Sequence, residues 1–550
     1  MTHELVIKGG TVVDGTGTPG VLADVGIDDG RVTAVGPDLE GTRVLDATGH
    51  VVAPGFIDIH THYDAQVFWD PQLTPSCYHG VTTVVAGNCG FSIAPTRPEH
   101  VDLIARTLEN VEDMDVAALA EGVPWDTFST FPEYLASVEA HGLGLNFGAY
   151  IGHTALRLFA MGDAAYERAA TPEEITGMQV ILREALEAGA AGFATSFAPT
   201  HRGADGMPVP SRFAERAELD ALLETLGDVG KGVAAFTPGE LIGVDELYEI
   251  QPGIGVPFTY TALLTMPTGS HLRMLDVNDA GWAKGAEVWP QTSPRPLKFS
   301  MSMAEPFTLN VNPQFAALMA TDDAARKAAY ADPMFREKAL TDWEGMTFGK
   351  PRWETYEVAE SATRPQLDGR RLLELAAEWG KTPFDTLMDL AGDEPTIRIG
   401  CMLANDDPDE VAKVLVRDHV TLGLSDAGAH VSQLCDAPQA TDYLGNWVRD
   451  RKLLPMEEAI RRLTSQQADI FGMADRGRLV PGAWADVVVF DPDTVAPGPL
   501  RRVRDFPANS ERLTADQPVG IRHVLVNGVP IQVDGVHDAA ARPGQLVKPA

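Results

Sequence analysis

Cysteine and positive charge are scarce in this chain of 550 residues, and long apolar runs are missing. The four cysteines show no paired spacing, which argues against a disulfide framework and favours a reducing, cytoplasmic location. No apolar run reaches the length of a membrane-spanning helix. Residues 1–6 lack the basic and apolar regions of a signal peptide. We therefore expect no membrane association.

Acidic residues outnumber basic ones, 78 to 43, and the formal net charge is −35. Repulsion from phosphate argues against a nucleic-acid partner, and a solvated acidic surface is the simplest interpretation of the excess. A chain of this length can bury a large core and should hold at least two domains. The composition is that of an enzyme acting on a small molecule, and a homo-oligomer is possible.

Both ends of the chain predict short β-strands. Alternating apolar residues with Gly and Asp turns occupy 5–15, 23–27 and 31–36, and the same texture returns at 478–482, 485–491 and 523–528. We predict a small β-sandwich built from both termini, residues 1–53 and 473–550, which flanks the long middle of the chain.

The middle, residues 54–472, alternates strands with helices. Strand-like runs fall near 54–60, 81–87, 144–151, 190–196, 232–237, 256–264, 397–403 and 420–425. Amphipathic helical segments lie between most of them, at 132–141, 172–189, 214–227, 368–379 and 407–417. Eight such units predict an α/β fold, a (β/α)₈ TIM-like barrel, with its chemistry at the C-terminal strand ends.

One stretch, about 270–365, does not fit the alternation. It is rich in Pro, Trp and Met. A structureless loop of that length would be unusual, so we predict an insertion with helices of its own that caps the active-site face.

Two histidines end the first predicted barrel strand, in Gly-Phe-Ile-Asp-Ile-His-Thr-His from Gly55. Side chains alternate along a strand, so His60 and His62 point to the same side and can share one metal ion. A His-x-His pair alone is a weak signal, but its place at a barrel strand end strengthens it.

Two further candidate ligands follow other strands. Cys89 lies between glycines after the second strand, in Gly-Asn-Cys-Gly, where a thiolate could complete the site. An arbitrary cysteine is more often a small buried hydrophobe. Asp426 follows the eighth strand and could ligate the metal and accept a proton from its water, although a helix-capping aspartate is a common alternative.

Other polar residues are candidates for contact with a substrate. His430 follows Asp426 by four residues and could hold it or a substrate group, or simply pack. His153 ends the third strand and could line the pocket. His201 and Arg202 follow the fourth strand, where an arginine fork could bind a carboxylate, although a loop pair of this kind is usually just solvated.

These motifs together resemble the amidohydrolase superfamily, and within it the N-acyl-D-amino-acid deacylase (D-aminoacylase) family. The resemblance spans nearly the whole chain. It rests on Val-Ile-Lys-Gly-Gly-Thr-Val-Val-Asp-Gly near the start, Pro-Gly-Phe-Ile-Asp-Ile-His-Thr-His-Tyr-Asp from Pro54, Gly-Asn-Cys-Gly from Gly87, Ser-Asp-Ala-Gly-Ala-His from Ser425 and the closing segment from Arg476. It implies a barrel with a β-sandwich, zinc, and amide hydrolysis. His60, His62 and Cys89 are then metal ligands, and Asp426 is both metal-associated and the general acid/base.

The chain departs from that family at the fifth and sixth strands, each of which normally supplies a ligand histidine. Residues 233–240 and 256–262 contain none, and Phe236 and Tyr260 occupy roughly the expected places. Three outcomes are open. One metal is held by the four residues above; Glu240, Tyr260 or His201 replaces the missing ligands; or catalysis is lost. Tyr260 is also a candidate for substrate contact.

We expect a metal-dependent amidohydrolase that cleaves the C–N bond of an N-acyl amino acid or a related small amide, with one Zn²⁺ rather than two. Metal-activated water attacks the carbonyl, and Asp426 transfers the proton. The alternative is a non-hydrolytic or non-catalytic member of the same fold. The intact Asp426 argues against that alternative, because a scaffold needs no proton carrier there.

Overall fold

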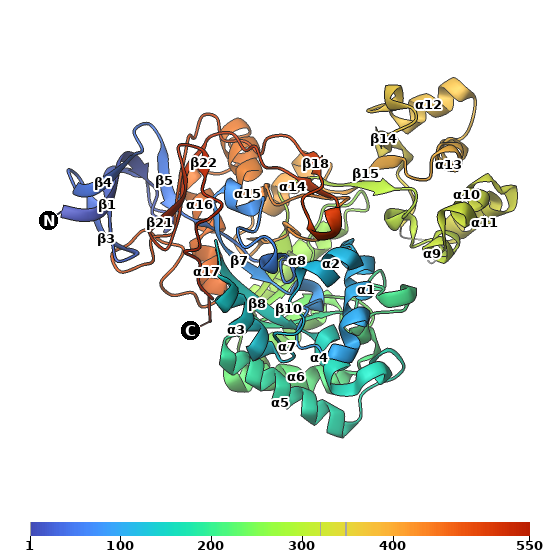
Figure 1. Ribbon diagram of the computed structural model, residues 1–550, viewed down its shortest axis with the longest axis horizontal. Coiled ribbons are helices and arrows are strands. Elements are labelled where there is room, and N and C mark those ends of the chain that lie inside the picture. The colour runs from blue at the N-terminus through green and yellow to red at the C-terminus, as the bar shows by residue number, and fades with distance from the viewer. Residues whose placement is uncertain (1, 320, 347–348, 550) are drawn as a thin grey trace.

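Eight parallel strands curl around one apolar interior at the centre of the molecule (Figure 1). This computed structural model describes residues 2–319, 321–346 and 349–549. In chain order the strands are β6 (Phe56–Asp58), β7 (Val81–Ala86), β8 (Asn146–Gly152), β9 (Gly192–Ser196), β10 (Val233–Thr237), β11 (Phe258–Tyr260), β12 (Val288–Thr292) and β16 (Thr421–Leu422). A parallel bridge between Thr61 and Ala427 joins the ends of the first and last strands. The predicted (β/α)₈ barrel is confirmed.

Both faces of the barrel strands are largely buried, as expected of a parallel sheet covered by helices. Ile57, Ile59 and Val85 belong to the interior cluster, while Phe236 and Tyr260 pack outward with the helices. Successive side chains along a strand point to opposite faces. This alternation therefore decides which residues at the C-terminal ends of the strands face the interior of the barrel.

The seventh barrel strand differs from the prediction. It is β12, which lies between β11 and β16 in the sheet, whereas 397–403 forms β15 (Arg398–Ala404) in a separate three-stranded sheet. Pro290 inside β12 is a poor signal for a central strand, and the apolar run of β15 looks like a buried strand in any sheet. The hydrophobic pattern of the sequence alone therefore predicts the wrong segment as the seventh barrel strand.

Helices cover the outside of the barrel and its rim (Figure 1). Threonine capping boxes begin α3 and α5, with Thr130 paired to Glu133 and Thr171 to Glu174. The helices are α1 (Val101–Glu112), α2 (Val116–Gly122), α3 (Phe131–His141), α4 (His153–Met161), α5 (Pro172–Ala188), α6 (Arg216–Val229), α7 (Val244–Ile254), α8 (Ser270–Trp282), α14 (Pro408–Leu415), α15 (Gln439–Asp442), α16 (Met456–Leu463) and α17 (Ser465–Ile470). Within the described residues, no helix is both long and apolar enough to cross a bilayer.

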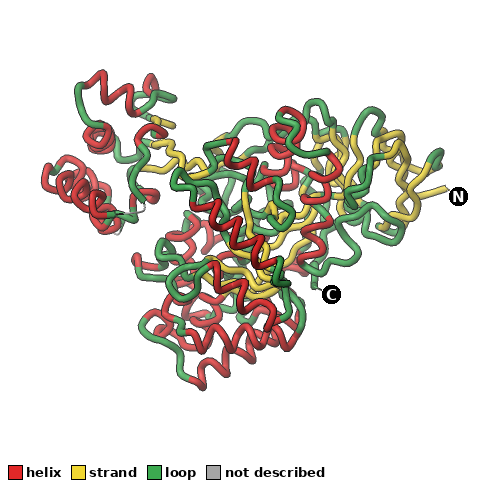
Figure 2. The backbone as a smooth tube through the Cα atoms, turned by 180° about the vertical axis from the view of Figure 1, so that it is seen from behind, coloured by secondary structure: helices red, strands yellow, loops and turns green. Residues whose placement is uncertain are grey.

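An arm projects from the barrel between β12 and β16 (Figures 1 and 2). It contains β13 (Leu297–Ser302), β14 (Glu357–Glu360), β15, α9 (Pro313–Leu318), α10 (Asp323–Ala331), α11 (Pro333–Gly345), α12 (Leu372–Trp379) and α13 (Pro383–Asp393). Its apolar core is separate from that of the barrel. The arm carries helices of its own, whereas α8 and β12, which fall within the segment of about 270–365 described above as an insertion, belong to the barrel.

A nine-stranded sheet joins the two ends of the chain at the opposite side of the barrel (Figure 1). It contains β1 (Thr2–Val12), β2 (Val21–Asp28), β3 (Arg31–Gly36), β4 (Glu40–Asp46), β5 (Val51–Pro54), β17 (Val487–Phe490), β20 (Ile521–Val526), β21 (Val529–Val533) and β22 (Val536–His537). β5 pairs with both β1 and β17, which links the two terminal segments. A separate hairpin, β18 (Arg501–Val503) and β19 (Arg512–Thr514), lies beside the arm.

Candidate metal centre

Two buried histidines lie just beyond β6 at the rim of the barrel. His60 and His62 are 0% and 3% exposed, and their ring centroids are 5.4 Å apart. The end of the eighth strand holds this segment: Ser425 Oγ donates to the His60 carbonyl oxygen at 3.0 Å, and the His62 N–H donates to the Ala427 carbonyl oxygen at 2.7 Å. Barrel closure therefore fixes the position of both rings.

A tight turn after β7 brings Cys89 to these histidines. Gly87, Cys89 and Gly90 all have positive φ angles of 83°, 56° and 79°, a region that glycine adopts without strain. The Asn88 amide donates to three main-chain carbonyls of β7 and of the segment after β6. These bonds lock the turn against the first strand and point the thiol to the imidazoles.

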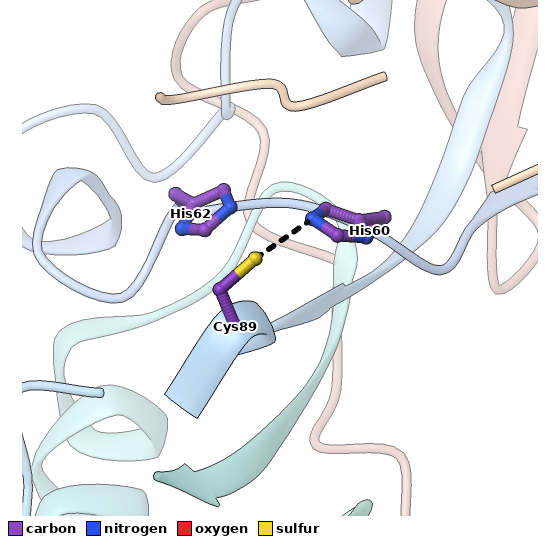
Figure 3. A group of neighbouring side chains, drawn as sticks. All are labelled: His60, His62 and Cys89. Carbon is purple, nitrogen blue, oxygen red and sulfur yellow. Dashed lines mark hydrogen bonds between the residues drawn. The ribbon is translucent and has the colours of Figure 1, made fainter. Parts of the chain in front are cut away.

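The donor atoms of His60, His62 and Cys89 form a compact group (Figure 3). All three lie within 4.8 Å of one another, and Cys89 Sγ is 3.7 Å from His60 Nε2. Among the described residues, this is the one group of three or more histidine, cysteine or acidic side chains close enough to hold a metal ion. The structure brings together the residues that the sequence predicted.

Asp426 joins this group from the end of the last strand, β16, which lies beside the first strand. Its Oδ1 lies 2.9 Å from His60 Nε2 and 3.8 Å from His62 Nε2, and its side chain is 19% exposed. The residue has a φ angle of 45°, so the chain turns sharply as it leaves β16. Asp426 is therefore both in contact with the histidines and accessible to a small molecule.

The electrostatics favour the ionised forms of the two acidic donors, Cys89 and Asp426. Burial by itself raises the pKa of the Cys89 thiol, but the neighbouring His60 and His62 outweigh burial and lower it. Burial likewise opposes ionisation of Asp426, yet the same histidines hold its pKa well below its usual value. For His60, burial is outweighed by the charge of Asp426, which raises its pKa to about 10.

Two imidazoles, a thiolate and a carboxylate are the donor types that zinc prefers. The thiol is already biased to its ionised form, which is the form that binds metal. The residues present thus fit one zinc ion held by His60, His62 and Cys89, with Asp426 either as a fourth ligand or beside an open position.

Two buried residues missed by the sequence interpretation contact the far sides of the histidine rings. Gln291 Oε1 lies 2.5 Å from His60 Nδ1, and Glu112 Oε1 lies 3.0 Å from His62 Nδ1. Thr261 Oγ1 is 3.2 Å from the same His60 nitrogen. Gln291 lay in the segment predicted as the insertion, and no local motif marks Glu112 at the end of α1.

Two of the predicted substrate contacts lie near the donor group. His201 Nδ1 bonds to Ser196 Oγ at 2.6 Å, and the charges of Glu112, His62 and Asp426 act on its ring, although burial dominates and lowers its pKa to about 4. His430 packs against two arm residues, Phe299 and Phe307, with ring centroids 5.1 and 5.0 Å away. His430 therefore connects the arm to the Asp426 turn.

Three other predicted substrate contacts lie elsewhere. His153 is buried against the outer helices and is held by Thr195 and by Glu218 of α6. Tyr260 faces outward beside Tyr248 of α7, because it sits one residue before the inward-facing Thr261. Arg202 is exposed and donates to the Gly206 carbonyl oxygen of its own loop at 3.1 Å.

The fifth and sixth strands place no substitute ligand in the donor group. By strand alternation, the inward-facing residues at their ends are Thr237 and Thr261, and Phe236 faces outward with Tyr260. Glu240 is 67% exposed and pairs with Arg212. A second ion of the kind that the family holds on these strands has no visible ligands among the described residues.

The comparison with known proteins agrees with this barrel fold. Residues 43–532 match the amidohydrolase family. The chain is 32% identical to N-acyl-D-glutamate deacylase of Alcaligenes xylosoxydans xylosoxydans over 565 residues, which cover 99% of this chain and 96% of that protein. The chain therefore belongs to the amidohydrolase family.

Several of its relatives over nearly the full length are deacylases. D-aminoacylase of Alcaligenes xylosoxydans xylosoxydans is 31% identical, with 96% of this chain and 94% of the relative covered. N-acyl-D-glutamate deacylase from Bordetella bronchiseptica, solved with zinc and a phosphonate inhibitor, is similar with a TM-score of 0.68 at 30% identity, and both chains are fully covered. A crystal structure of D-aminoacylase has a TM-score of 0.69 at 27% identity, with 99% and 100% of the two chains covered.

Proposed function

We propose that this protein is a zinc-dependent deacylase that hydrolyses the amide bond of N-acyl-D-amino acids and uses one metal ion. The observation that carries the proposal is the buried group of His60, His62 and Cys89 with Asp426 against it. The amide-hydrolase class follows from the family, and the N-acyl-D-amino-acid substrate follows from the similarity to deacylases over nearly the full length.

His60, His62 and Cys89 would hold the zinc ion, which lowers the pKa of a water molecule and polarises a carbonyl group when it is bound. Asp426 accepts the proton of the attacking water, because its carboxylate is ionised and partly exposed. The same carboxyl group then returns the proton to the leaving nitrogen as the C–N bond breaks. One water is consumed, and a carboxylic acid and an amine are released.

The remaining residues near the centre bind the substrate. His201 and His430 approach from two sides of the barrel rim, and Phe299 and Phe307 place an apolar wall beside His430. This wall suits an apolar acyl group. Arg202 has no part in the proposal, because it is turned to its own loop.

The residues at the ends of the fifth and sixth strands favour a site with one metal ion over a site with two. Their inward-facing ends carry Thr237 and Thr261, and a neutral hydroxyl is a poor zinc ligand beside imidazole and thiolate. The donor set on the other side of the rim is sufficient for one ion. A solved D-aminoacylase is described as having a binuclear centre with one-metal activation and second-metal attenuation, so activity with one metal has a precedent in a relative.

Metal content by elemental mass spectrometry tests the proposal, on the wild type and on His60→Ala and Cys89→Ala. We expect about one zinc per chain, lost in both variants together with hydrolysis of a panel of N-acyl-D- and N-acyl-L-amino acids. Cys401→Ala is the matched control, because Cys401 is buried in the arm core and should leave zinc and activity intact. Two ions per chain would contradict the one-ion site. No zinc, or no hydrolysis by the zinc-loaded protein, would favour a non-catalytic member of the fold.

A further inference from the structure

The histidines of the candidate metal centre are each held from behind by a different element. Gln291 of β12 approaches His60 Nδ1 to 2.5 Å, and Glu112 of α1 approaches His62 Nδ1 to 3.0 Å. In both rings the other nitrogen, Nε2, is the one that faces Asp426. The two rings thus have the same orientation although their partners come from unrelated parts of the chain.

Gln291 selects one tautomer of His60. Its amide oxygen accepts hydrogen bonds and cannot donate, so the imidazole proton that it contacts sits on Nδ1. Gln291 is 1% exposed, and Thr261 Oγ1 donates to the same oxygen at 3.1 Å, which restricts its movement. The same orientation turns Nε2 of His60 to Cys89 and Asp426, so Nε2 is the nitrogen that would bind a metal ion.

Glu112 occupies a place where a carboxylate is unfavourable on its own. It is the last residue of α1, where the helix dipole disfavours negative charge, and it is only 3% exposed. A buried carboxylate in such a place needs a compensating partner. The nitrogen that it faces is Nδ1 of His62, so the helix end and the metal-site ring are matched to each other.

We propose that Glu112 and Gln291 are positioning residues that hold the orientation of His62 and His60, Glu112 by an ion-pair contact and Gln291 by a hydrogen bond, so that both Nε2 atoms are presented to one metal ion. This inference rests on the proposed function for the metal itself. A carboxylate or carbonyl oxygen behind a ligating imidazole raises its basicity and fixes its ring. Neither residue contacts the metal or the substrate in this proposal.

Zinc affinity, measured by competition with a chromophoric chelator on the full-length zinc-loaded protein, tests this role. We expect Glu112→Ala and Gln291→Ala each to bind zinc about 10–100-fold more weakly than wild type. Glu112→Gln keeps an acceptor oxygen and should recover most of the loss. The visible spectrum of the cobalt-substituted protein should change in the alanine variants, because the ligand geometry loosens.

Glu218→Gln is the matched control, because Glu218 is a buried glutamate that contacts a buried histidine, His153, at 2.7 Å in the outer layer. It should leave zinc affinity unchanged even if it lowers the melting temperature. Should Glu112→Ala fold poorly, Gln291→Ala and Glu112→Leu, which removes the acceptor oxygens but keeps most of the side-chain volume, still carry the test. Wild-type zinc affinity in Gln291→Ala and Glu112→Ala, or an equal loss in Glu218→Gln, would overturn the inference. Absence of zinc from the wild type would instead overturn the proposed function on which it rests.

Discussion

The barrel rim has two sides that share a backbone and differ in chemistry. The ends of β6, β7 and β16, here called the ligand side, carry His60, His62, Cys89 and Asp426. The ends of β10 and β11, the threonine side, carry Thr237 and Thr261. The strands on both sides are parallel and buried, and they belong to the same eight-stranded sheet.

Because the strands on the two sides are alike, the backbone of the barrel does not by itself determine how many metal ions the rim can hold. The backbone places inward-facing residues at every strand end, and the side chains there decide what binds. On the threonine side, Thr261 supports His60 by a hydroxyl contact of 3.2 Å and provides no strong ligand. That side is therefore expected to assist one metal site and not to form a second.

The largest effect is expected from the proton carrier of the ligand side. Asp426→Asn keeps the shape of the side chain but cannot accept the proton of water, so turnover of an N-acyl-D-amino acid should fall by about 10²–10⁴-fold. Zinc content should remain near the wild-type value, because His60, His62 and Cys89 are unchanged. Steady-state kinetics and elemental analysis of the same sample check both points. A variant that keeps most of its turnover would show that another group carries the proton.

A paired substitution compares the two sides directly. Cys89→Ser should weaken zinc binding by more than about 100-fold. Loss of a residue that only supports the metal ligands usually weakens binding by less than this. Thr237→Val should have no measurable effect on zinc, because the buried Thr237 hydroxyl makes no hydrogen bond. Chelator competition on both variants gives the contrast. Equal losses in the two variants would mean that the threonine side also supplies a ligand.

His79 is a buried histidine away from the rim, and its hydrogen-bond partners are a hydroxyl and a carbonyl oxygen. Its pKa therefore shows the effect of burial without an acidic partner. His79 contacts Thr441 Oγ1 and the Ala515 carbonyl oxygen, and burial lowers its pKa to about 4. The unfolded chain takes up the proton near pH 6.5, and the folded protein resists it until about pH 4. Stability contributed by neutral His79 is thus complete above pH 6.5 and is lost as the pH falls to 4.

Between pH 7.5 and pH 5, the two values compared, the loss should be about 2 kcal/mol. Urea unfolding at pH 7.5 and pH 5, on wild type and His79→Gln, measures it as a change in the midpoint. Glutamine can keep both hydrogen bonds but does not titrate, so the variant should lose less stability at pH 5. Parallel pH dependence in the two proteins would assign the effect to other groups.

The smallest effect is expected at Thr261. Thr261→Val removes the hydroxyl that contacts His60 Nδ1 and Gln291 Oε1 but preserves the shape of the side chain. Loss of one neutral hydrogen bond should weaken zinc binding by a few fold, about 0.5–1 kcal/mol. The same chelator competition can resolve this change. A loss as large as that of Cys89→Ser would make Thr261 a ligand and break the contrast between the two sides.

Local patterns predicted the parts of the protein that depend on nearby residues. The alternation of strands and helices predicted the barrel, and His60, His62 and Cys89 could be recognised because each follows its own strand within a short motif. The orientation of Tyr260 could not be recognised in the same way. Its direction depends on where β11 ends, and a shift of one residue reverses the face.

The sequence by itself determined that two imidazoles, a thiolate and a carboxylate stand at the ends of parallel strands, because strand periodicity and turn glycines are local properties. What lies behind those side chains depends on how distant parts of the chain pack together. Gln291 reaches His60 across 231 residues, and Glu112 arrives on a helix whose end is set by packing. Contacts between such distant residues form only when the barrel closes, and no local sequence pattern encodes that closure. They orient the two histidine rings, whereas the positions of these histidines at the strand end follow from the local pattern.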